Sequence, residues 1–181
     1  MHSTQDLQEH LQKHGIPSMV IGGIAVAVWG EPRLTRDADL KILLSREEAQ
    51  RLIKILTPDF RFLADAPETT LQQFGFIFIK DATGVRLDLL LAETSFDAQA
   101  IERRRAVEVE PKASILVTSP EDLIVYKMIS TRPRDHEDII GVIRRQNNAL
   151  DDAYILNWLL QFEQALDDLT LVAVYRRMRS L

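Results

Sequence analysis

The sequence contains no cysteine, so disulfide bonds and thiolate metal sites play no part in this protein. Disulfides persist in oxidising compartments, whereas a chain that needs none is suited to a reducing one. We therefore expect a cytoplasmic protein that depends on its hydrophobic core for stability.

Long hydrophobic runs are missing as well. The longest apolar stretch, residues 19–29, is shorter than a membrane-spanning helix and contains Gly22 and Gly23. Residues 1–10 are polar and lack the apolar segment of a secretory signal. The sequence thus predicts neither export nor membrane anchoring.

The chain has no excess of positive charge, since 22 Lys and Arg against 27 Asp and Glu give a formal net charge of −5. Proteins that wrap long nucleic acids normally carry clustered basic residues in excess, so this balance disfavours a structural DNA-binding role. Short arginine clusters do occur, and such runs are usually solvated helix faces. They are Arg103–Arg105, Arg144–Arg145 and Arg176–Arg177.

The chain does have enough apolar content for a core. Its 181 residues are 46% hydrophobic, which suits one domain or a compact core with a helical appendage. Strand-like patterns dominate the first half and helix-like patterns the second, which predicts the α+β class. We expect a core at residues 1–118 and a helical region at 119–181 packed on it, or a single domain formed by both.

Apolar periodicity, turn residues and capping residues predict the individual elements. The expected strands are residues 18–21, 36–44, 74–80, 85–92, 107–109 and 115–117, with a hairpin turn at 81–84. The expected helices are residues 4–14, 24–29, 45–56, 95–105, 119–129, 135–146, 152–166 and 170–178.

Three aspartates carry the strongest functional signal. Asp37 and Asp39 are two positions apart in a predicted strand, so their side chains share one face. Asp88 interrupts the mostly apolar run of residues 85–91, where an unpaired buried carboxylate is costly. Its carboxylate must therefore face solvent or meet a cation.

The three carboxylates can converge if their two strands pair side by side. Cross-strand and diagonal neighbours lie roughly 5 to 8 Å apart, and three like charges at that spacing repel strongly unless a divalent cation lies between them. Oxygen ligands suit Mg²⁺, or Mn²⁺ in its place, rather than zinc. The four histidines have no metal-ligand spacing with other donors, which also disfavours zinc.

The acids belong to a longer pattern. Ile21-Gly22-Gly23, then Asp37-Ala38-Asp39-Leu40, then Leu87-Asp88-Leu89 together resemble the active-site pattern of the polymerase-β-like nucleotidyltransferase superfamily. The string from Pro32 to Asp39, taken with the glycine pair, more narrowly resembles the AbiEii-type toxins and their small uncharacterised relatives. In the second half, residues 122–138 are similar to later motifs of the same group. The chain is shorter than full AbiEii toxins and longer than minimal nucleotidyltransferase antitoxins, so the toxin and antitoxin roles both stay open.

The resemblance implies a nucleotidyltransferase-like mixed sheet with flanking helices and a helical C-terminal half. It implies Mg²⁺-dependent transfer of a nucleoside monophosphate (NMP) from a nucleoside triphosphate (NTP) to a hydroxyl of an RNA (tRNA) or protein acceptor, with release of pyrophosphate. Asp37, Asp39 and Asp88 are then the catalytic and metal-binding residues. A toxin–antitoxin system further implies an antitoxin partner.

Other residues are candidate nucleotide ligands, each with a purely structural alternative. Gly22 and Gly23 let backbone N–H groups approach a triphosphate, or they form only a tight turn. Lys127 contacts a nucleotide phosphate, or it pairs with a nearby acid. Side chains just ahead of the acids contact phosphate, or they are solvated loop residues. These loop residues are Arg33, Thr35 and Arg36.

Two acids, Asp135 and Asp138, are candidate active-site acids of the second half. Both also suit the first turn of a helix, where a carboxylate interacts favourably with the helix dipole. We expect that helix role for at least one of them.

The alternative function is a non-catalytic nucleotide-binding or partner-binding module on the same fold. A degenerate member is expected to have lost one of the acids, whereas this chain retains Asp37, Asp39 and Asp88. The enzyme is therefore the favoured interpretation.

Overall fold

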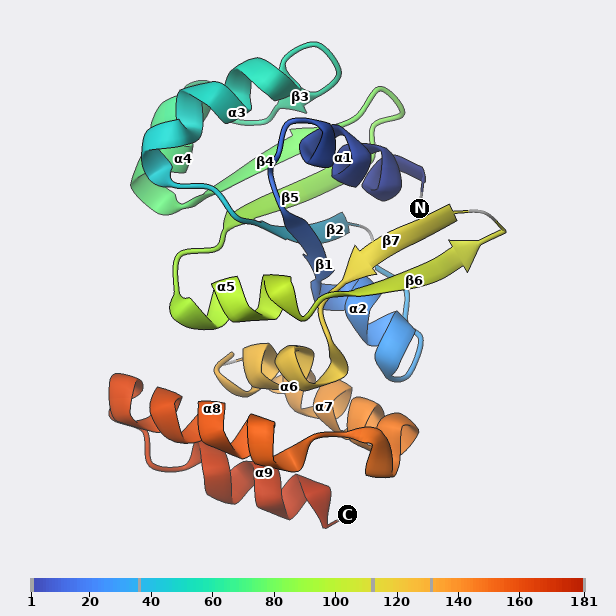
Figure 1. Ribbon diagram of the computed structural model, residues 1–181, viewed down its shortest axis with the longest axis vertical. Helices are drawn as coiled ribbons and strands as arrows, with labels where there is room; N and C mark the ends of the chain where they lie inside the picture. The colour runs from blue at the N-terminus through green and yellow to red at the C-terminus, as the bar shows by residue number, and fades with distance from the viewer. Residues whose placement is uncertain (1, 36, 112, 131, 181) are drawn as a thin grey trace. The chain divides into compact units, whose positions relative to one another are not determined.

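The structure is a computed structural model that describes residues 2–35, 37–111, 113–130 and 132–180. These residues form a mixed sheet and a set of helices, which confirms the predicted α+β class (Figure 1). The chain divides into two compact units, here called unit 1 (Met1–Ile24 and Leu34–Thr118) and unit 2 (Ala25–Arg33 and Ser119–Leu181). The assignment of residues 1–118 as a catalytic core remains a prediction.

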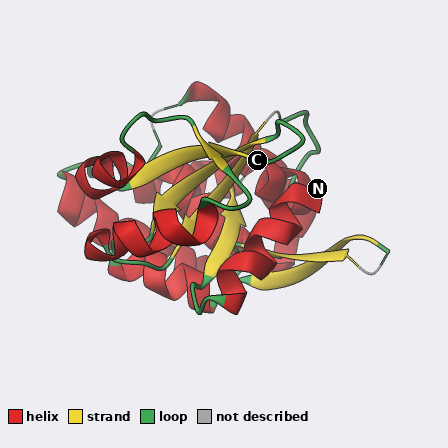
Figure 2. Ribbon diagram, turned by 90° about the horizontal axis from the view of Figure 1, so that it is seen from above, coloured by secondary structure: helices red, strands yellow, loops and turns green. Residues whose placement is uncertain are grey.

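Unit 1 contains the sheet, which has seven strands within the described residues. They are β1 (Ser18–Ile21), β2 (Asp37–Ile42), β3 (Arg61–Phe62), β4 (Phe76–Lys80), β5 (Arg86–Leu91), β6 (Arg105–Glu110) and β7 (Ala113–Val117). Their order is β3-β4-β5-β2-β1-β7-β6, with parallel pairing of β5 with β2 and of β1 with β7 and antiparallel pairing elsewhere. The β6–β7 hairpin projects away from the other strands (Figure 2).

Helices cover both faces of this sheet. The helices α1, α3 and α4 lie on one side and α5 on the other (Figure 1). Strand β2 alternates buried Ala38, Leu40 and Ile42 with partly exposed polar residues. Its apolar face needs a covering layer, and its polar face needs a covering layer or a ligand. The helices are α1 (His2–Lys13), α3 (Ala49–Leu56), preceded by the 3₁₀ turn η1 (Arg46–Glu48), α4 (Pro67–Phe74) and α5 (Ser95–Glu102).

Two elements of unit 1 were not predicted, the short strand β3 and the helix α4. Phe74 was expected to begin a strand, but it ends α4. Gly75 follows with φ of +72°, a left-handed conformation that stops a helix, so the strand begins only at Phe76. Pro67 at the first position of α4 and Gly75 after its end were the available signals.

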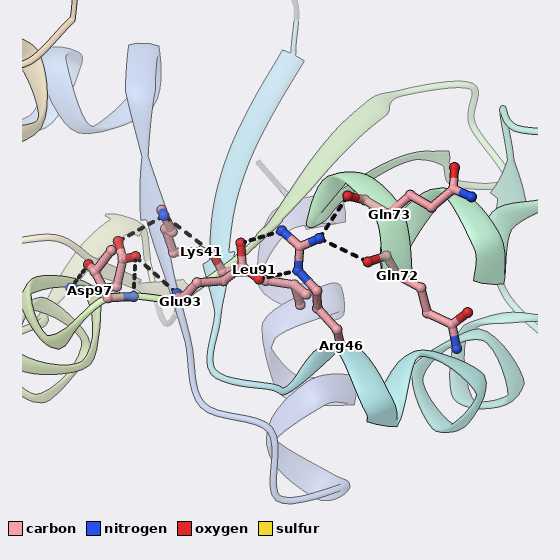
Figure 3. A network of polar contacts seen from close by, with 8 residues as sticks. Lys41, Arg46, Gln72, Gln73, Leu91, Glu93 and Asp97 are labelled. Carbon is pink, nitrogen blue, oxygen red and sulfur yellow. Dashed lines mark hydrogen bonds and ion pairs between the residues drawn. The ribbon is translucent and has the colours of Figure 1, made fainter.

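A polar network joins the carboxyl ends of β2 and β5 to α5 and α4 (Figure 3). Lys41 Nζ lies 2.8 Å from Asp97 Oδ1 and donates to Leu91 O at 3.2 Å. Asp97 Oδ2 also accepts the backbone N–H groups of Glu93 at 3.0 Å and of Thr94 at 3.1 Å, and the bond from Thr94 belongs to the capping box of α5. Arg46 forms a bidentate ion pair with Glu93 and donates to two carbonyls near the end of α4. These contacts hold α5 on the face of β2 to which Lys41 belongs.

Unit 2 is helical. Its helices are α6 (Pro120–Met128), α7 (Pro133–Gln146), α8 (Asp152–Leu166) and α9 (Leu171–Arg179). Residues 25–29 of α2 (Gly22–Trp29) also belong to this unit. Gly30 lies so close to α7 that a Cβ would approach Val142 Cγ2 to 2.9 Å. No helix in the described part of the chain is long and apolar enough to cross a membrane.

Candidate active site

The acid-bearing strands β2 and β5 are neighbours in the sheet, so the condition under which the three carboxylates can converge is met. Asp39 is the register partner of Asp88, and Asp37 is the partner of Arg86. Residues two apart on a strand share a face, so these four side chains lie on the same face of the sheet. That face carries three carboxylates and one guanidinium at adjacent positions.

Arg86 supplies the cation that the buried Asp88 requires. Its Nε and Nη2 donate to Asp88 Oδ1 and Oδ2 at 2.6 and 2.9 Å, which makes a bidentate ion pair. These hydrogen bonds raise the pKa of Arg86 against the opposing effect of burial, and the charges of Asp88, Asp37 and Asp39 raise it further. The guanidinium also lies 4.2 Å from the centroid of the Phe78 ring.

The glycine pair lies directly against the acids and the segment that leads to them. Gly22 has φ of +62°, and a Cβ at this position would lie 2.0 Å from Asp39 Oδ2. A Cβ at Gly23 would lie 2.9 Å from Thr35 Oγ1, and that hydroxyl donates to Asp37 O at 2.9 Å. The absence of side chains therefore admits Asp39 and Thr35 to the β1–α2 turn, a reason that differs from the predicted approach to a triphosphate.

A surface pocket of about 530 Å³ has one of the three acids, Asp37, in its lining. Asp37, Lys80 and Arg86 contribute its charged groups, and the β4–β5 hairpin closes one side with residues 83–85. The pocket is large enough for a small ligand or for the end of a polymer. It places both cationic and anionic side chains around a single opening.

The candidate residues of the second half form a separate cluster inside unit 2. Lys127 Nζ lies 2.5 Å from Asp135 Oδ1 and 2.8 Å from Asp138 Oδ2, and all three residues are buried. Arg33 donates to both carboxylate oxygens of Asp138 at 3.2 and 3.3 Å. The ion-pair alternative for Lys127 is thus what the structure contains, and a phosphate contact by Lys127 or Arg33 remains a prediction.

Asp135 occupies the first turn of α7, as expected for one of the two acids. Burial raises the pKa of Asp135, but hydrogen bonds from Lys127 and Ser130 outweigh that effect and leave the pKa below its ordinary value. The side chain therefore stays ionised as the partner of Lys127. Arg36, the remaining predicted ligand, lies outside the described residues.

A protein-family model now places the chain among known proteins. The model described as "Nucleotidyl transferase AbiEii toxin, Type IV TA system" matches residues 9–179. The chain belongs to this AbiEii family. The predicted resemblance is therefore confirmed, and with it the assignment to nucleotidyltransferases. Among curated proteins, none matches the chain.

Solved structures share the fold of this AbiEii-family chain. An antigenic nucleotidyltransferase-like protein from Paracoccidioides brasiliensis is 18% identical with a TM-score of 0.54, over 96% of this chain and 91% of that one. The antibiotic-resistance factor ANT(2″)-Ia, in complex with adenylyl-2″-tobramycin, is 14% identical with a TM-score of 0.55, over 87% of this chain and 93% of that one. At these identities the likeness establishes a nucleotidyltransferase-like fold.

The sequence did not lead us to three basic residues that share the sheet face of the acids in this AbiEii-family chain. Arg86 stands two positions before Asp88, so the period-two rule for strands already predicted a shared face. Lys80 and Arg61 reach the same face only through the pairing of β4 with β5 and of β3 with β4. No local pattern indicated that pairing for Arg61, because β3 has only two residues.

Proposed function

We propose that this AbiEii-family chain transfers an NMP from an NTP to a hydroxyl of an RNA (tRNA) or protein acceptor. The acceptor oxygen forms a bond to the α-phosphorus while the bond from that phosphorus to the bridging oxygen breaks. Pyrophosphate leaves with the bonding electron pair, and the hydroxyl proton passes to a carboxylate. The observation that carries this proposal is the register pairing of Asp39, which lies against the glycine turn, with Asp88, and Asp37 lies on the same face of β2.

The acids suit a divalent cation in their chemistry, and they lie on adjacent strands. Their hard carboxylate oxygens favour Mg²⁺ or Mn²⁺, and adjacent strands bring them within cross-strand distance of one another. Among the described residues, however, no three acidic or histidine side chains already surround one point, and Arg86 holds both oxygens of Asp88. Asp37, Asp39 and Asp88 would hold the ion once Arg86 moves aside. Such an ion activates an attacking hydroxyl and offsets phosphate charge.

The glycine turn is the expected place for the triphosphate. The first N–H groups of a helix lack partners within the helix, and they favour anions. Gly22 and Gly23 begin α2 at the end of β1, next to Asp39. Thr35 packs against Gly23 and completes this side of the candidate site.

We further propose a role in a cytoplasmic toxin–antitoxin system, with an antitoxin as partner. This follows the description of the family, a toxin of a type IV system. Toxicity on expression in bacteria, relieved by a neighbouring gene product, is the expected result. Expression that leaves growth unaffected, with transferase activity intact, would contradict the toxin role.

The test of the activity uses the variants Asp39→Asn and Asp88→Asn. The protein is incubated with each α-labelled NTP, a bulk tRNA pool and a cell lysate, and the labelled molecules are identified. Labelling should disappear in both variants and persist in Asp65→Asn, which changes an exposed acid of the same unit. Labelling at the wild-type rate by the Asp39 or Asp88 variant refutes the assignment.

One observation favours the second candidate, a non-catalytic binding module. Arg86 already supplies the positive charge beside Asp88 that a metal ion would otherwise provide. Calorimetry with Mg²⁺ and each NTP, followed by a pyrophosphate assay, separates the two functions. NTP binding with no release of pyrophosphate from any acceptor mixture supports the module.

A further inference from the structure

Three basic side chains form a row across the strands on the acid side of the sheet. Arg61 on β3 is the register partner of Lys80 on β4, and Lys80 is the partner of Arg86 on β5. Arg86 is in turn the partner of Asp37 on β2. Directly paired residues project from the same face, so the basic row (Arg61, Lys80, Arg86) ends at the first of the three acids.

This row carries an electrostatic cost that the described chain does not offset. Like charges directly opposite each other on neighbouring strands are destabilising. Arg86 has its partner in Asp88, whereas neither Arg61 nor Lys80 makes an ion pair with any described residue. Asp81, the acid next to Lys80 in sequence, instead accepts hydrogen bonds from the backbone N–H groups of Thr83 and Val85 at 2.9 and 2.8 Å. The row is therefore ready to receive an anion.

The position of the row relative to the glycine turn determines the side from which an anionic acceptor approaches. The strand order places β1, with Gly22 at its end, on one side of β2. The strands of the row, β5, β4 and β3, lie on the other side. Transfer from an NTP needs the attacking and leaving oxygens roughly in line on opposite sides of the α-phosphorus. A triphosphate at the glycine turn thus requires an acceptor that arrives over the β4–β5 hairpin.

The rings of Phe76 and Phe78 continue the same face along β4, and the ring of Phe74, at the end of α4, follows them. Phe78 is the register partner of Asp88, and its ring lies 5.1 Å from that of Phe76, which lies 6.0 Å from that of Phe74. The guanidinium of Arg86 covers Phe78 at 4.2 Å. Cations that follow phosphates, combined with aromatic or guanidinium planes that stack on bases, are the usual means of binding a single strand.

We propose that the basic row binds the phosphates of a single-stranded polynucleotide acceptor and delivers its terminal hydroxyl to the acids from the β4–β5 hairpin. This inference rests on the proposed function and narrows its acceptor from RNA or protein to a polynucleotide. The pocket beside Asp37, which Lys80 and Arg86 line, receives the end of the strand. A phosphate that takes up Arg86 also releases both oxygens of Asp88, so arrival of the acceptor would prepare the acid cluster.

The test compares two double variants that lose the same charge. Arg61→Gln/Lys80→Gln removes the free part of the row, and Lys13→Gln/Lys54→Gln removes two exposed cations from α1 and α3. Binding of a short fluorescent single-stranded RNA is measured by anisotropy over a range of salt concentrations. The row variant should bind roughly tenfold more weakly and lose about 1.4 from the slope of log K against log salt, or 0.7 per phosphate contact. The same loss is expected with single-stranded DNA, because the row contacts phosphates.

Lys80→Arg serves as the conservative variant, and it should retain the affinity of the wild type. Equal affinity and slope in the row variant and the wild type overturn the inference, as does an equal loss in the α1/α3 variant. Label that enters only a protein, at the wild-type rate in the row variant, overturns it as well. The binding measurement does not depend on turnover. Binding that depends on the row, with no NMP transfer, rejects the proposed function but supports the row. RNA labelling that the row variant leaves unchanged rejects the role of the row alone.

Discussion

Arg86 holds both carboxylate oxygens of Asp88 from two positions earlier on the same strand. The pair neutralises one acid of a cluster that would otherwise carry three adjacent negative charges. Under the proposed function, a metal ion would have to compete with this guanidinium for Asp88. The competition between guanidinium and metal is open to direct measurement.

The first prediction concerns Arg86→Gln. Without added metal, the variant should have a lower melting temperature than the wild type, because Asp88 loses its cation; the cost is about 1 to 2 kcal/mol, reduced by the partial exposure of Arg86. With Mn²⁺ or Mg²⁺, the variant should gain more stability than the wild type gains, since the metal ion no longer competes with the guanidinium for Asp88. Thermal unfolding over a metal titration measures both effects. Arg51→Gln, which breaks an exposed pair with Glu48, is the control, and an equal metal effect in all three proteins contradicts the competition.

The second prediction concerns Gly22→Ala. The new Cβ would lie 2.0 Å from Asp39 Oδ2, so this carboxylate must move, and a shift of about 1 Å in a reacting group costs roughly 100-fold in rate. Gly15→Ala is the matched control, since Gly15 has φ of +70° and a Cβ added there would meet nothing within 4 Å. Both variants should lose about 1 kcal/mol of unfolding free energy to backbone strain. Only Gly22→Ala should lose NMP transfer, and comparable transfer by the two variants would show that Asp39 tolerates displacement.

The third prediction concerns Lys127→Met in unit 2. The substitution leaves Asp135 and Asp138 buried without their shared ammonium, and only Arg33 still pairs with one of them. Removing one partner of a buried ion pair costs about 3 to 5 kcal/mol, so urea denaturation should reveal a loss in that range. Adding Asp135→Asn should recover part of the loss, because one of the two uncompensated charges disappears. A Lys127→Met protein as stable as the wild type would mean that the cluster is hydrated.

The fourth prediction is a pH dependence that Asp135 contributes. The pKa of this carboxyl is lowered in the folded protein, so its contribution to stability is complete above the ordinary value of 3.8 and is lost as pH falls through the lower folded value. Asp135→Asn should therefore be less stable than the wild type at neutral pH, and the difference should shrink at about pH 3. Urea denaturation of both proteins at the two pH values measures the difference. A gap that stays constant with pH would contradict this role of Asp135.

Much of the acid site could be predicted from local pattern. The spacing of Asp37 and Asp39 indicated their shared face, and the leucine neighbours of Asp88 indicated a carboxylate that either faces solvent or meets a cation. The nature of that cation was not predicted: a metal was expected, and the structure places Arg86 there. The helix α4 was missed although Pro67 and Gly75 bounded it, because only Leu71 and Phe74 follow the proline as apolar residues, too few to define a helical period.

The cluster in unit 2 illustrates the limit of local reasoning. Lys127, Asp135 and Asp138 could each be placed on a helix from the sequence, and both phosphate binding and ion pairing suited Lys127. Only the packing of α6 with α7 brings the ammonium between the two carboxylates. Arg33, distant in sequence, completes the arrangement through Asp138.

The sequence by itself determined which side chains share a strand face and where the chain turns at Gly22 and Gly23, and it identified the acids that are candidates to bind a hard cation. These properties follow from the period of a strand and from the steric freedom of glycine, and both act within a few residues. The tertiary structure alone decided that Asp39 stands opposite Asp88 and that Arg61, Lys80 and Arg86 line up toward Asp37. Strand order and register depend on contacts between residues far apart in the chain, which no local pattern specifies.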